Sequence, residues 1–254
     1  MKFTVITVCL NASDVIERTI RSTASQTYKG VELIIVDGGS TDGTLDIVNR
    51  YTQSVSHFIS EPDNGIYDAM NKGLRYSHGE YVCFMNAGDT FFSSFTLEKV
   101  AAHINGADII CGISHLAHHK YWIPVRPAAP AIRIAYGHNV NHQATFIRRE
   151  LLDEGYDTRY TIIADDLFFV NQLLFRKASY KRLWQVVCNY DVNGISSHPK
   201  YLAQIKAERK AFLLEHLQQL PDFSAFSFKC SLLLEKIVHR LLTLYIRFCI
   251  EKQS

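Results

Sequence analysis

The sequence predicts an α/β fold with a mainly parallel central sheet and helices on both of its faces, followed by a helical appendage. Short runs of apolar and β-branched residues alternate with segments of helical periodicity through the first half of the chain. Such alternation is typical of parallel sheets, because the connection between two parallel strands crosses a face of the sheet as a helix. Several of these runs end in polar residues, and ligands of such sheets bind beyond the carboxyl ends of the strands.

The first half of the chain contains the clearest elements. Strands are expected at residues 3–10, 31–36, 57–60 and 80–85, where apolar and β-branched residues dominate. Helices are expected at residues 14–26, 44–51 and 67–76. Apolar residues recur at helical spacing in the first helix, and the hydroxyl and carboxylate side chains of Thr41–Thr44 can cap the second. Strands therefore alternate with helices in the order that a parallel sheet requires.

The second half is less regular. Strands are expected at residues 107–113, 141–148 and 184–193, and a helix at residues 165–175. The proline-rich stretch 124–130 predicts an irregular loop, and from residue 201 the pattern is helical apart from a break around Pro221. We therefore expect one domain over residues 1–200 and a C-terminal helical region over residues 201–254.

Composition and charge narrow the functional classes. The 254 residues are 47% hydrophobic and 20% charged, as in ordinary globular proteins, and a net charge of +2 argues against a nucleic-acid partner. The six cysteines are scattered singly without a Cys-x-x-Cys pair, which favours core thiols in a reducing compartment. The apolar run at the N-terminus is too short for a typical signal sequence and fits a buried first strand, so we expect a cytoplasmic protein.

The most informative stretch is Glu61–Gly73, which reads Glu-Pro-Asp-Asn-Gly-Ile-Tyr-Asp-Ala-Met-Asn-Lys-Gly. It packs turn residues, carboxylates, amides and a lysine into one short segment between two buried elements. Polar groups at this density are costly to bury unless they face a polar ligand. The segment therefore predicts one wall of a binding pocket, with Asn64, Asp68 and Lys72 as candidate ligand contacts.

Two strand ends carry acids that suit different tasks. Asp37 ends an apolar strand and precedes two glycines, so its carboxylate can accept hydrogen bonds from a base or a ribose, while a capping acid in a strand-to-helix turn is an equal alternative. Asp89 follows the strand at residues 80–85, and oxygen ligands in such a turn suit Mg²⁺ or Mn²⁺ that also grips a diphosphate. A loop aspartate that makes an Asx-turn is the favoured alternative for Asp89 taken alone.

Asp165 and Asp166 stand at the start of an expected helix. Either acid could serve as a general base beside an acceptor hydroxyl, although on spacing alone the complementing of the helix dipole is favoured. His142 and Gln143 interrupt an apolar strand pattern, and a core histidine is as probable as a phosphate or acceptor contact.

A further histidine group recurs at helical spacing. His115, His118 and His119 stand at positions i, i+3 and i+4, which could gather a metal on one helix face. The segment lacks clear helical character and an evident fourth ligand, so a solvated loop is the favoured interpretation.

Taken together, these motifs resemble the family-two glycosyltransferases, which have the GT-A fold, a Rossmann-like arrangement. Within this family, the sequence most resembles the branch that includes colanic-acid and other bacterial exopolysaccharide or O-antigen transferases. The matching pieces occur in family order and cover about residues 3–195; they are Ile6–Asn11, Val36–Thr44, Glu61–Gly73, Met85–Asp89, Asn141–Phe146 and Ile163–Leu167.

The resemblance implies a role for each candidate residue. The implied contacts to the nucleotide sugar are Asn11, Asp37, Gly38, Asn64, Asp68, Lys72, Asn86 and His142. Asp37 would hold the nucleotide base, Asp89 would bind Mg²⁺ or Mn²⁺, and Asp165 would be the catalytic base. The metal motif carries one carboxylate where the family usually has two. The base motif is one residue shorter than usual, so Asp166 competes with Asp165 for the role.

The implied activity is that of an inverting glycosyltransferase in bacterial surface polysaccharide biosynthesis. It would move a sugar from a UDP- or GDP-sugar donor to a lipid-linked glycan acceptor. The reduced metal motif leaves open a second class, a catalytically silent subunit that binds sugar nucleotides within a polysaccharide assembly complex. A third class, a nucleotidyltransferase, would require a glycine-rich basic loop after the first strand, and Asn11–Asp14 is not such a loop.

The C-terminal region carries a separate pattern. Residues 226–250 are mostly apolar but are interrupted by charges too often for a membrane-spanning helix. Lys229, Lys236, Arg240 and Arg247 fall within roughly 40° of one another on a helix. A narrow basic stripe on an apolar helix predicts attachment to a membrane surface, here the inner face of the cytoplasmic membrane. A helix packed on the domain or in a dimer is the alternative.

Overall fold

The computed structural model describes residues 2–116, 140–191 and 199–216. Contacts within the chain divide it into two compact units, residues 1–209 and residues 210–254. The sheet lies in the first unit. The basic stripe expected at residues 226–250 lies outside the described residues, as do Cys230, Cys249, His118 and His119.

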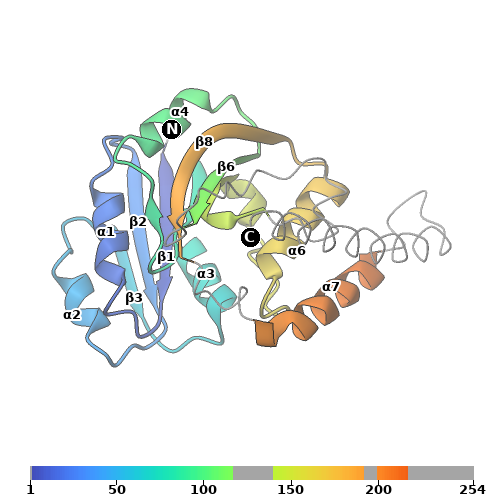
Figure 1. Cartoon of the computed structure of the whole chain (residues 1–254), viewed down its shortest axis with the longest axis horizontal. Helices are drawn as coiled ribbons and strands as arrows, with labels where there is room; N and C mark the ends of the chain where they lie inside the picture. Colours follow the sequence, from blue (N-terminus) through green and yellow to red (C-terminus); the bar gives the residue numbers. More distant parts are fainter. Residues whose placement is uncertain (1, 117–139, 192–198, 217–254) are drawn as a thin grey trace, which may run out of the picture. The chain divides into compact units, whose positions relative to one another are not determined.

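The described residues form an eight-stranded sheet in the order β3-β2-β1-β4-β7-β6-β8-β5 (Figure 1). The strands are β1 Phe3–Cys9, β2 Val31–Asp37, β3 His57–Ser60, β4 Tyr81–Phe84, β5 Thr90–Phe91, β6 Ile109–Leu116, β7 Thr145–Arg148 and β8 Tyr180–Tyr190. All run in one direction except β7 and β5, which are antiparallel to their neighbours. This arrangement confirms the predicted mainly parallel sheet.

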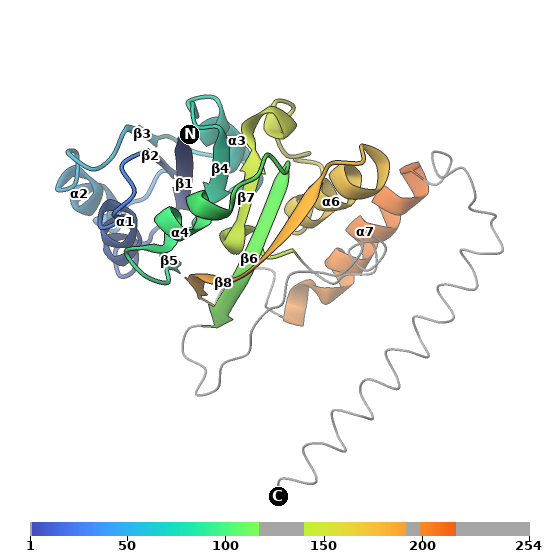
Figure 2. The same ribbon diagram turned by 90° about the horizontal axis from the view of Figure 1, so that it is seen from above.

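Helices cover both faces of the sheet, as expected. The helices are α1 Ile16–Ala24, α2 Thr44–Asn49, α3 Ile66–Leu74, α4 Thr96–His103, α6 Ala164–Val170 and α7 Leu202–His216. Shorter helical turns are η1 His142–Ala144, η2 Arg149–Leu152, η3 Asn171–Phe175 and η5 Pro199–Tyr201. Seen from above, α1 and α3 lie on opposite sides of β1 (Figure 2).

The central strands β1, β2 and β4 are buried and mostly apolar because both of their faces are covered. Phe3 and Val5 of β1 belong to the core cluster that includes residues of α1 and α4. Ile6 points to the other face, where α3 approaches closely: a Cβ at Gly73 would lie 2.7 Å from Ile6 Cγ2. Gly73, the last residue of the Glu61–Gly73 stretch, therefore lets α3 pack against the sheet.

Four elements differ from the sequence prediction. The strand expected to begin at residue 141 begins at Thr145, because Asn141 caps a turn there by accepting the Gln143 N–H at 3.0 Å. The strand expected at residues 184–193 begins earlier, at Tyr180, where polar and aromatic residues hide the strand pattern. The short helix α4 and the two-residue strand β5 were not expected, because neither carries a long periodic pattern.

Candidate active site

The carboxyl ends of neighbouring strands carry the predicted polar residues. Asn11 follows β1, Asp37 ends β2, and Asn86 follows β4. Because β7 runs antiparallel to β4, the turn that precedes β7 lies at the same edge of the sheet and brings His142 to 3.2 Å from Asn86. Residues from four separate motifs therefore meet at one edge.

Asp37 is fully buried at the end of β2. Its carboxylate accepts hydrogen bonds from the backbone N–H groups of Gly39 (3.0 Å) and Ser40 (2.9 Å) and from the hydroxyls of Ser40 and Ser60, the latter at 2.8 Å. Burial opposes ionisation, but these hydrogen bonds outweigh it and hold the pKa of Asp37 below its ordinary value. The ionised carboxylate therefore fixes the turn after β2.

Asn11 lies beside this turn in the left-handed conformation, with φ at 48°. Its backbone N–H donates to Ser40 Oγ at 2.7 Å, and its side-chain oxygen accepts the Thr41 N–H at 3.0 Å. On the other side, Gly38 lies against Asp63, since a Cβ at position 38 would come within 2.3 Å of an Asp63 carboxylate oxygen. The segments after β1, after β2 and before α3 are thereby joined.

The Glu61–Gly73 stretch satisfies part of its own polarity. The backbone N–H of Asn64 donates to the Asp68 carboxylate at 3.0 Å. Lys72 Nζ pairs with Glu61 at 2.9 Å and Asp68 at 3.7 Å, and donates to the Pro62 carbonyl at 2.8 Å. The hydrogen bond to Glu61 raises the pKa of Lys72. These contacts hold the loop before α3 against the helix.

Asp165 stands in the first turn of α6 and is the centre of a hydrogen-bonded network. His142 Nδ1 lies 2.6 Å from Asp165 Oδ2, and the Tyr67 hydroxyl donates to Oδ1 at 2.5 Å. Burial opposes ionisation of Asp165, but the charge and hydrogen bond of His142 lower its pKa. Asp165 in turn raises the pKa of His142 against the effect of burial. With Asn86 on Nε2 of His142, the network joins the end of β4, α3, η1 and α6.

Asp166 points to different partners from those of its neighbour. Its side chain is 5% exposed, and Oδ2 accepts a hydrogen bond from Arg209 Nη2 of α7 at 2.9 Å. Burial and the charge of Asp165 raise the pKa of Asp166 to about 7, although Arg209 opposes the rise. The two adjacent acids are thus held in different environments.

Asp89 is 3% exposed in the turn after β4. Its Oδ1 accepts the backbone N–H of Asp191, which follows β8, at 2.8 Å, and burial raises its pKa to about 6. Helix α1 holds this turn: the Thr19 hydroxyl donates to the Asp89 carbonyl at 2.8 Å and accepts the Gly88 N–H at 2.9 Å. The turn is therefore rigidly supported from two sides.

The oxygen atoms of this turn fit a metal that is shared with a phosphate ligand. Asn86 Oδ1 is buried and has no hydrogen-bond partner among the described residues. Mg²⁺ prefers oxygen and is commonly held by one or two carboxylates, with phosphate and water completing its shell. Within residues 2–116, 140–191 and 199–216, no group of three or more His, Cys, Asp or Glu side chains could hold a metal unaided. The single carboxylate of Asp89 is consistent with such a shared metal.

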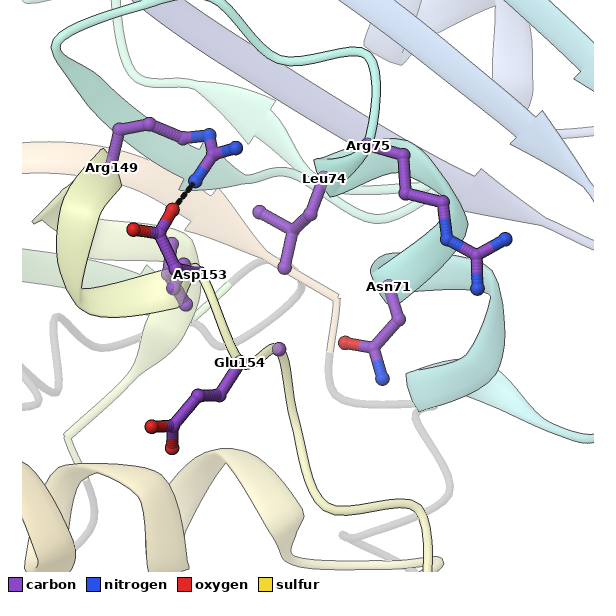
Figure 3. A pocket seen from close by; sticks show the side chains of 8 residues that line it. Asn71, Leu74, Arg75, Arg149, Asp153 and Glu154 are labelled. Atoms are coloured by element: carbon purple, nitrogen blue, oxygen red, sulfur yellow. Dashed lines mark hydrogen bonds and ion pairs between the residues drawn. The ribbon is translucent and has the colours of Figure 1, made fainter.

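Figure 3 shows a surface cavity, whose volume is about 320 Å³. It is lined by Asn71, Leu74, Arg75, Arg149, Leu152, Asp153, Glu154 and Gly155. Figure 3 shows the ion pair between Arg149 and Asp153 across one wall. No residue predicted for the donor, metal or base site lines it.

The sequence analysis did not identify four residues that contact the predicted acids or the start of α6: Tyr67, Asp191, Glu208 and Arg209. Tyr67 lies inside the stretch that was singled out for polarity, and Asp191 follows its strand as Asp89 does, so each carried a usable signal. Nothing in the sequence pattern of α7 indicated contact with α6.

The first of the three histidines that recur at helical spacing does not lie on a helix. His115 lies in strand β6, and its Nδ1 is 2.8 Å from Asn189 Oδ1 of β8. Both the metal-binding helix face and the favoured solvated loop are therefore wrong at this position, because His115 belongs to a strand. In the described part of the chain, no helix is both long and apolar enough to cross a membrane.

Comparison with known proteins gives a consistent picture. Residues 4–154 match the sequence profile of glycosyl transferase family 2. A PGL/p-HBAD biosynthesis glycosyltransferase of Mycobacterium bovis is 34% identical over 172 residues, 64% of this chain and 66% of the relative. The cholesterol galactosyltransferase of Borreliella burgdorferi is 28% identical over 204 residues, 70% of this chain and 56% of the relative. The chain thus spans about two thirds or less of these relatives.

Solved structures share the fold. Residues 1–349 of S. aureus TarS, determined in complex with UDP, superpose with a TM-score of 0.67 at 21% identity, covering 88% of this chain and 67% of that fragment. A mannosyltransferase from Pyrobaculum calidifontis, in complex with GDP-Man and Mn²⁺, superposes with a TM-score of 0.61 at 20% identity, covering 88% of this chain and 65% of that protein. These similarities support the GT-A fold predicted from the sequence.

Proposed function

Because the chain belongs to glycosyl transferase family 2, we propose that it transfers a sugar from a nucleotide-sugar donor to an acceptor hydroxyl with inversion at the anomeric carbon. The observation that carries the proposal is the position of Asp165. Its carboxylate is held by Tyr67 and His142 at one edge of the sheet. Asn11, Asp89 and the turn that follows Asp37 lie at the same edge. The donor elements and a candidate base therefore share one edge.

Asp165 is suited to remove the acceptor proton. A carboxylate offers about four lone-pair sites, so the hydrogen bonds to Tyr67 and His142 leave sites for the acceptor. As the proton moves to Asp165, the acceptor oxygen forms a bond to the anomeric carbon. The bond from that carbon to the diphosphate oxygen breaks, and the nucleoside diphosphate leaves with the electron pair. General-base help of this kind contributes roughly 10²–10⁴-fold.

Asp89 would hold the divalent metal, Mg²⁺ or Mn²⁺, that the family resemblance and the Mn²⁺-bound mannosyltransferase support. When bound, the metal neutralises charge on the diphosphate. The chain positions Asp89 through the Asp191 N–H, and the unpartnered Asn86 Oδ1 on the same turn is available to the donor or to water. Asp37 contributes to donor binding indirectly, because it fixes the turn beside Asn11.

We propose a lipid-linked glycan as the acceptor, within bacterial surface polysaccharide biosynthesis. The support is the resemblance of the motifs, the basic stripe expected over residues 226–250, and a relative whose name specifies cholesterol as the substrate. The stripe would attach the enzyme to the inner face of the cytoplasmic membrane. Fractionation tests this: a chain ending at residue 222 should leave the membrane fraction, and unchanged membrane association overturns the attachment.

The activity is tested with a panel of UDP-, GDP- and dTDP-sugars, with and without Mn²⁺, by measuring release of the nucleoside diphosphate. The wild-type chain should turn over at least one donor, and Asp165→Asn should lower the rate by about 10²–10⁴-fold while nucleotide binding, followed by calorimetry, is retained. Near-normal rates in Asp165→Asn would transfer the role to Asp166. Donor binding without turnover in the wild type would favour the silent binding subunit.

A further inference from the structure

We propose that Glu208 and Arg209 of α7 are positioning residues, which fix the start of α6 so that Asp165 faces the acceptor and Asp166 faces away. The inference rests on the proposed function, in which Asp165 is the base. Both residues belong to the first compact unit, as does α6. They contact the helix start through two independent sets of bonds, one to the backbone and one to a side chain.

Glu208 anchors the backbone that leads into α6. The N-cap residue Ile163 makes no side-chain capping bond. The Glu208 carboxylate instead accepts the backbone N–H groups of Thr161 (3.0 Å), Ile162 (3.1 Å) and Ile163 (3.2 Å), and the Thr161 hydroxyl at 3.1 Å. Thr161 and Ile162 precede α6 and Ile163 is its N-cap residue, so Glu208 fixes the entry to the helix, and a carboxylate near a helix start complements the helix dipole. One side chain from α7 thus fixes three consecutive peptide groups.

These peptide groups connect directly to the base. Ile162 donates its N–H to Glu208, and its carbonyl accepts the Tyr67 hydroxyl at 2.9 Å. The same hydroxyl lies 2.5 Å from Asp165 Oδ1. A shift of the peptide at Ile162 would therefore change the geometry of the bond between Tyr67 and Asp165. Glu208 does not touch the base, but a chain of three hydrogen bonds, through Ile162 and Tyr67, connects it to Asp165.

Arg209 acts on the neighbouring acid. Its guanidinium pairs with Asp166 at 2.9 Å, with side-chain exposures of 16% and 5%. Two adjacent carboxylates repel each other, and a buried cation beside one of them removes much of that repulsion. The pair also turns the Asp166 side chain toward α7, which leaves Asp165 as the acid that meets His142 and Tyr67. Arg209 thereby selects which of the two acids faces the acceptor.

The test uses the full chain with Glu208→Gln, Arg209→Met and Arg209→Lys, and Lys206→Met as the matched control. Lys206 is exposed on the same helix, so its replacement changes the charge of α7 by the same amount as Arg209→Met. Hydrolysis of the UDP-, GDP- and dTDP-sugar panel is measured with UDP and GDP affinity and the thermal midpoint. Misplacing a catalytic group by about 1 Å costs on the order of 10²-fold. We expect kcat to fall by about 10- to 100-fold in Glu208→Gln and Arg209→Met, with nucleotide affinity unchanged and partial rescue in Arg209→Lys.

The decisive measurement combines each change with Asp165→Asn. If α7 acts through the base, Glu208→Gln and Arg209→Met lower the rate in the wild type but not further in the Asp165→Asn background. Equal fold losses in both backgrounds, full activity in both α7 variants, or an equal loss in Lys206→Met overturns the inference. Should Arg209→Met not fold, Glu208→Gln and Arg209→Lys carry the same comparison. A normal rate in Asp165→Asn alone instead shows that Asp165 is not the base, which removes the premise taken from the proposed function.

Discussion

Tyr67 donates its phenolic hydrogen to Asp165 across a separation of 98 residues, with 2.5 Å between the two oxygens. Tyr67 lies in the polar stretch before β4, and Asp165 lies at the start of α6. The Ile162 carbonyl oxygen also lies 2.9 Å from the Tyr67 hydroxyl oxygen, so the single hydrogen is shared between the two acceptors. The most distinctive stretch of the sequence therefore contacts the proposed base as well as forming the loop beside the proposed donor edge.

Replacement of Tyr67 with phenylalanine should impair turnover more than folding. The ring packs edge-on against Tyr156 at 5.5 Å and would stay in place, whereas Asp165 would lose one of the two donors that stabilise its charge. A hydrogen bond to a charged group is worth about 1.5–3 kcal/mol. We expect kcat to fall by about tenfold or more, since about 1.4 kcal/mol corresponds to tenfold in rate. Steady-state kinetics and urea unfolding measure the two effects separately.

Tyr156→Phe is the matched control. Its ring belongs to the same aromatic cluster, but its hydroxyl is buried without a hydrogen-bond partner among the described residues. Removing an unsatisfied buried hydroxyl is neutral or stabilising. Tyr156→Phe should therefore retain activity and unfold at the same urea concentration or a higher one. Equal loss of kcat in both variants would show that the loss does not come from the bond between Tyr67 and Asp165.

Asp37→Asn should disturb the donor edge through the loop that it organises. Oδ2 accepts the N–H groups of Gly39 and Ser40 and the hydroxyl of Ser60, and Oδ1 accepts the hydroxyl of Ser40. An amide nitrogen in place of either oxygen therefore leaves at least one of these donors without its partner. We expect a loss of about 2–4 kcal/mol in the free energy of unfolding and weaker binding of every nucleotide. Ser60→Ala removes one donor and leaves the carboxylate, so its effect should be smaller.

Calorimetry with UDP and GDP distinguishes an effect through the loop from direct contact between Asp37 and the nucleotide base. If Asp37 reads the base, Asp37→Asn changes the ratio of the two affinities. If the carboxylate acts through the turn after β2, both affinities fall together, and Ser60→Ala lowers them in the same proportion to a smaller extent. A changed ratio with unchanged stability would contradict the structural role.

Strand and helix alternation was enough to predict the parallel half of the sheet and the edge where the site lies. Asp37 and Asp89 could be located because each follows a continuous apolar strand, a local pattern that needs no knowledge of tertiary contacts. The turn at His142 could not, because Asn141 caps it through a side-chain bond that competes with the strand pattern.

The contacts of α7 were beyond the sequence for a different reason. Glu208 and Arg209 lie on a helix of mixed charge, where acidic and basic residues usually face solvent. Their partners Ile162 and Asp166 lie more than forty residues earlier, and no periodicity connects the two segments. Pairings between distant elements depend on packing, which a local pattern does not record.

Asp89→Asn should weaken the metal-dependent part of donor binding. The amide oxygen can still accept the Asp191 N–H, so the turn keeps its bond while the negative charge that attracts a cation is lost. We expect Mn²⁺ to tighten UDP binding in the wild type, and Asp89→Asn to reduce that gain by about 10-fold or more, since outer-shell changes alone cost 10–100-fold. Calorimetry with and without Mn²⁺ and the EPR signal of free Mn²⁺ measure it.

The control for this change is Asp46→Asn, which removes the same charge from an exposed position on α2. It should leave the effect of Mn²⁺ on UDP affinity intact. If Asp89→Asn binds UDP and Mn²⁺ as the wild type does, Asp89 is not the metal ligand, and the acid serves the turn alone.

Glu32→Gln should lower stability in a manner that depends on pH. Glu32 is 6% exposed and accepts hydrogen bonds from the Thr4 hydroxyl at 2.6 Å and the His78 N–H at 2.8 Å, with Lys2 at 3.3 Å. Burial opposes ionisation, but these bonds prevail and lower the pKa of Glu32 from 4.5 to about 2.

The lowered pKa determines how the stabilisation by Glu32 depends on pH. The stabilisation is fully present above the unfolded value of 4.5 and is lost as the pH falls toward 2, because protons then bind the unfolded carboxylate first. At pH 7 we expect Glu32→Gln to lower the free energy of unfolding by roughly 2–3 kcal/mol, since each unit of pKa shift corresponds to about 1.4 kcal/mol. Urea unfolding at pH 7 and pH 3 should show the difference from wild type shrinking at the lower pH. Glu80→Gln, at an exposed ion pair 3.7 Å from Arg148, should change stability by less than about 1 kcal/mol at both values. A constant deficit for Glu32→Gln across this range would mean that packing, and not the ionised carboxylate, stabilises this end of the sheet.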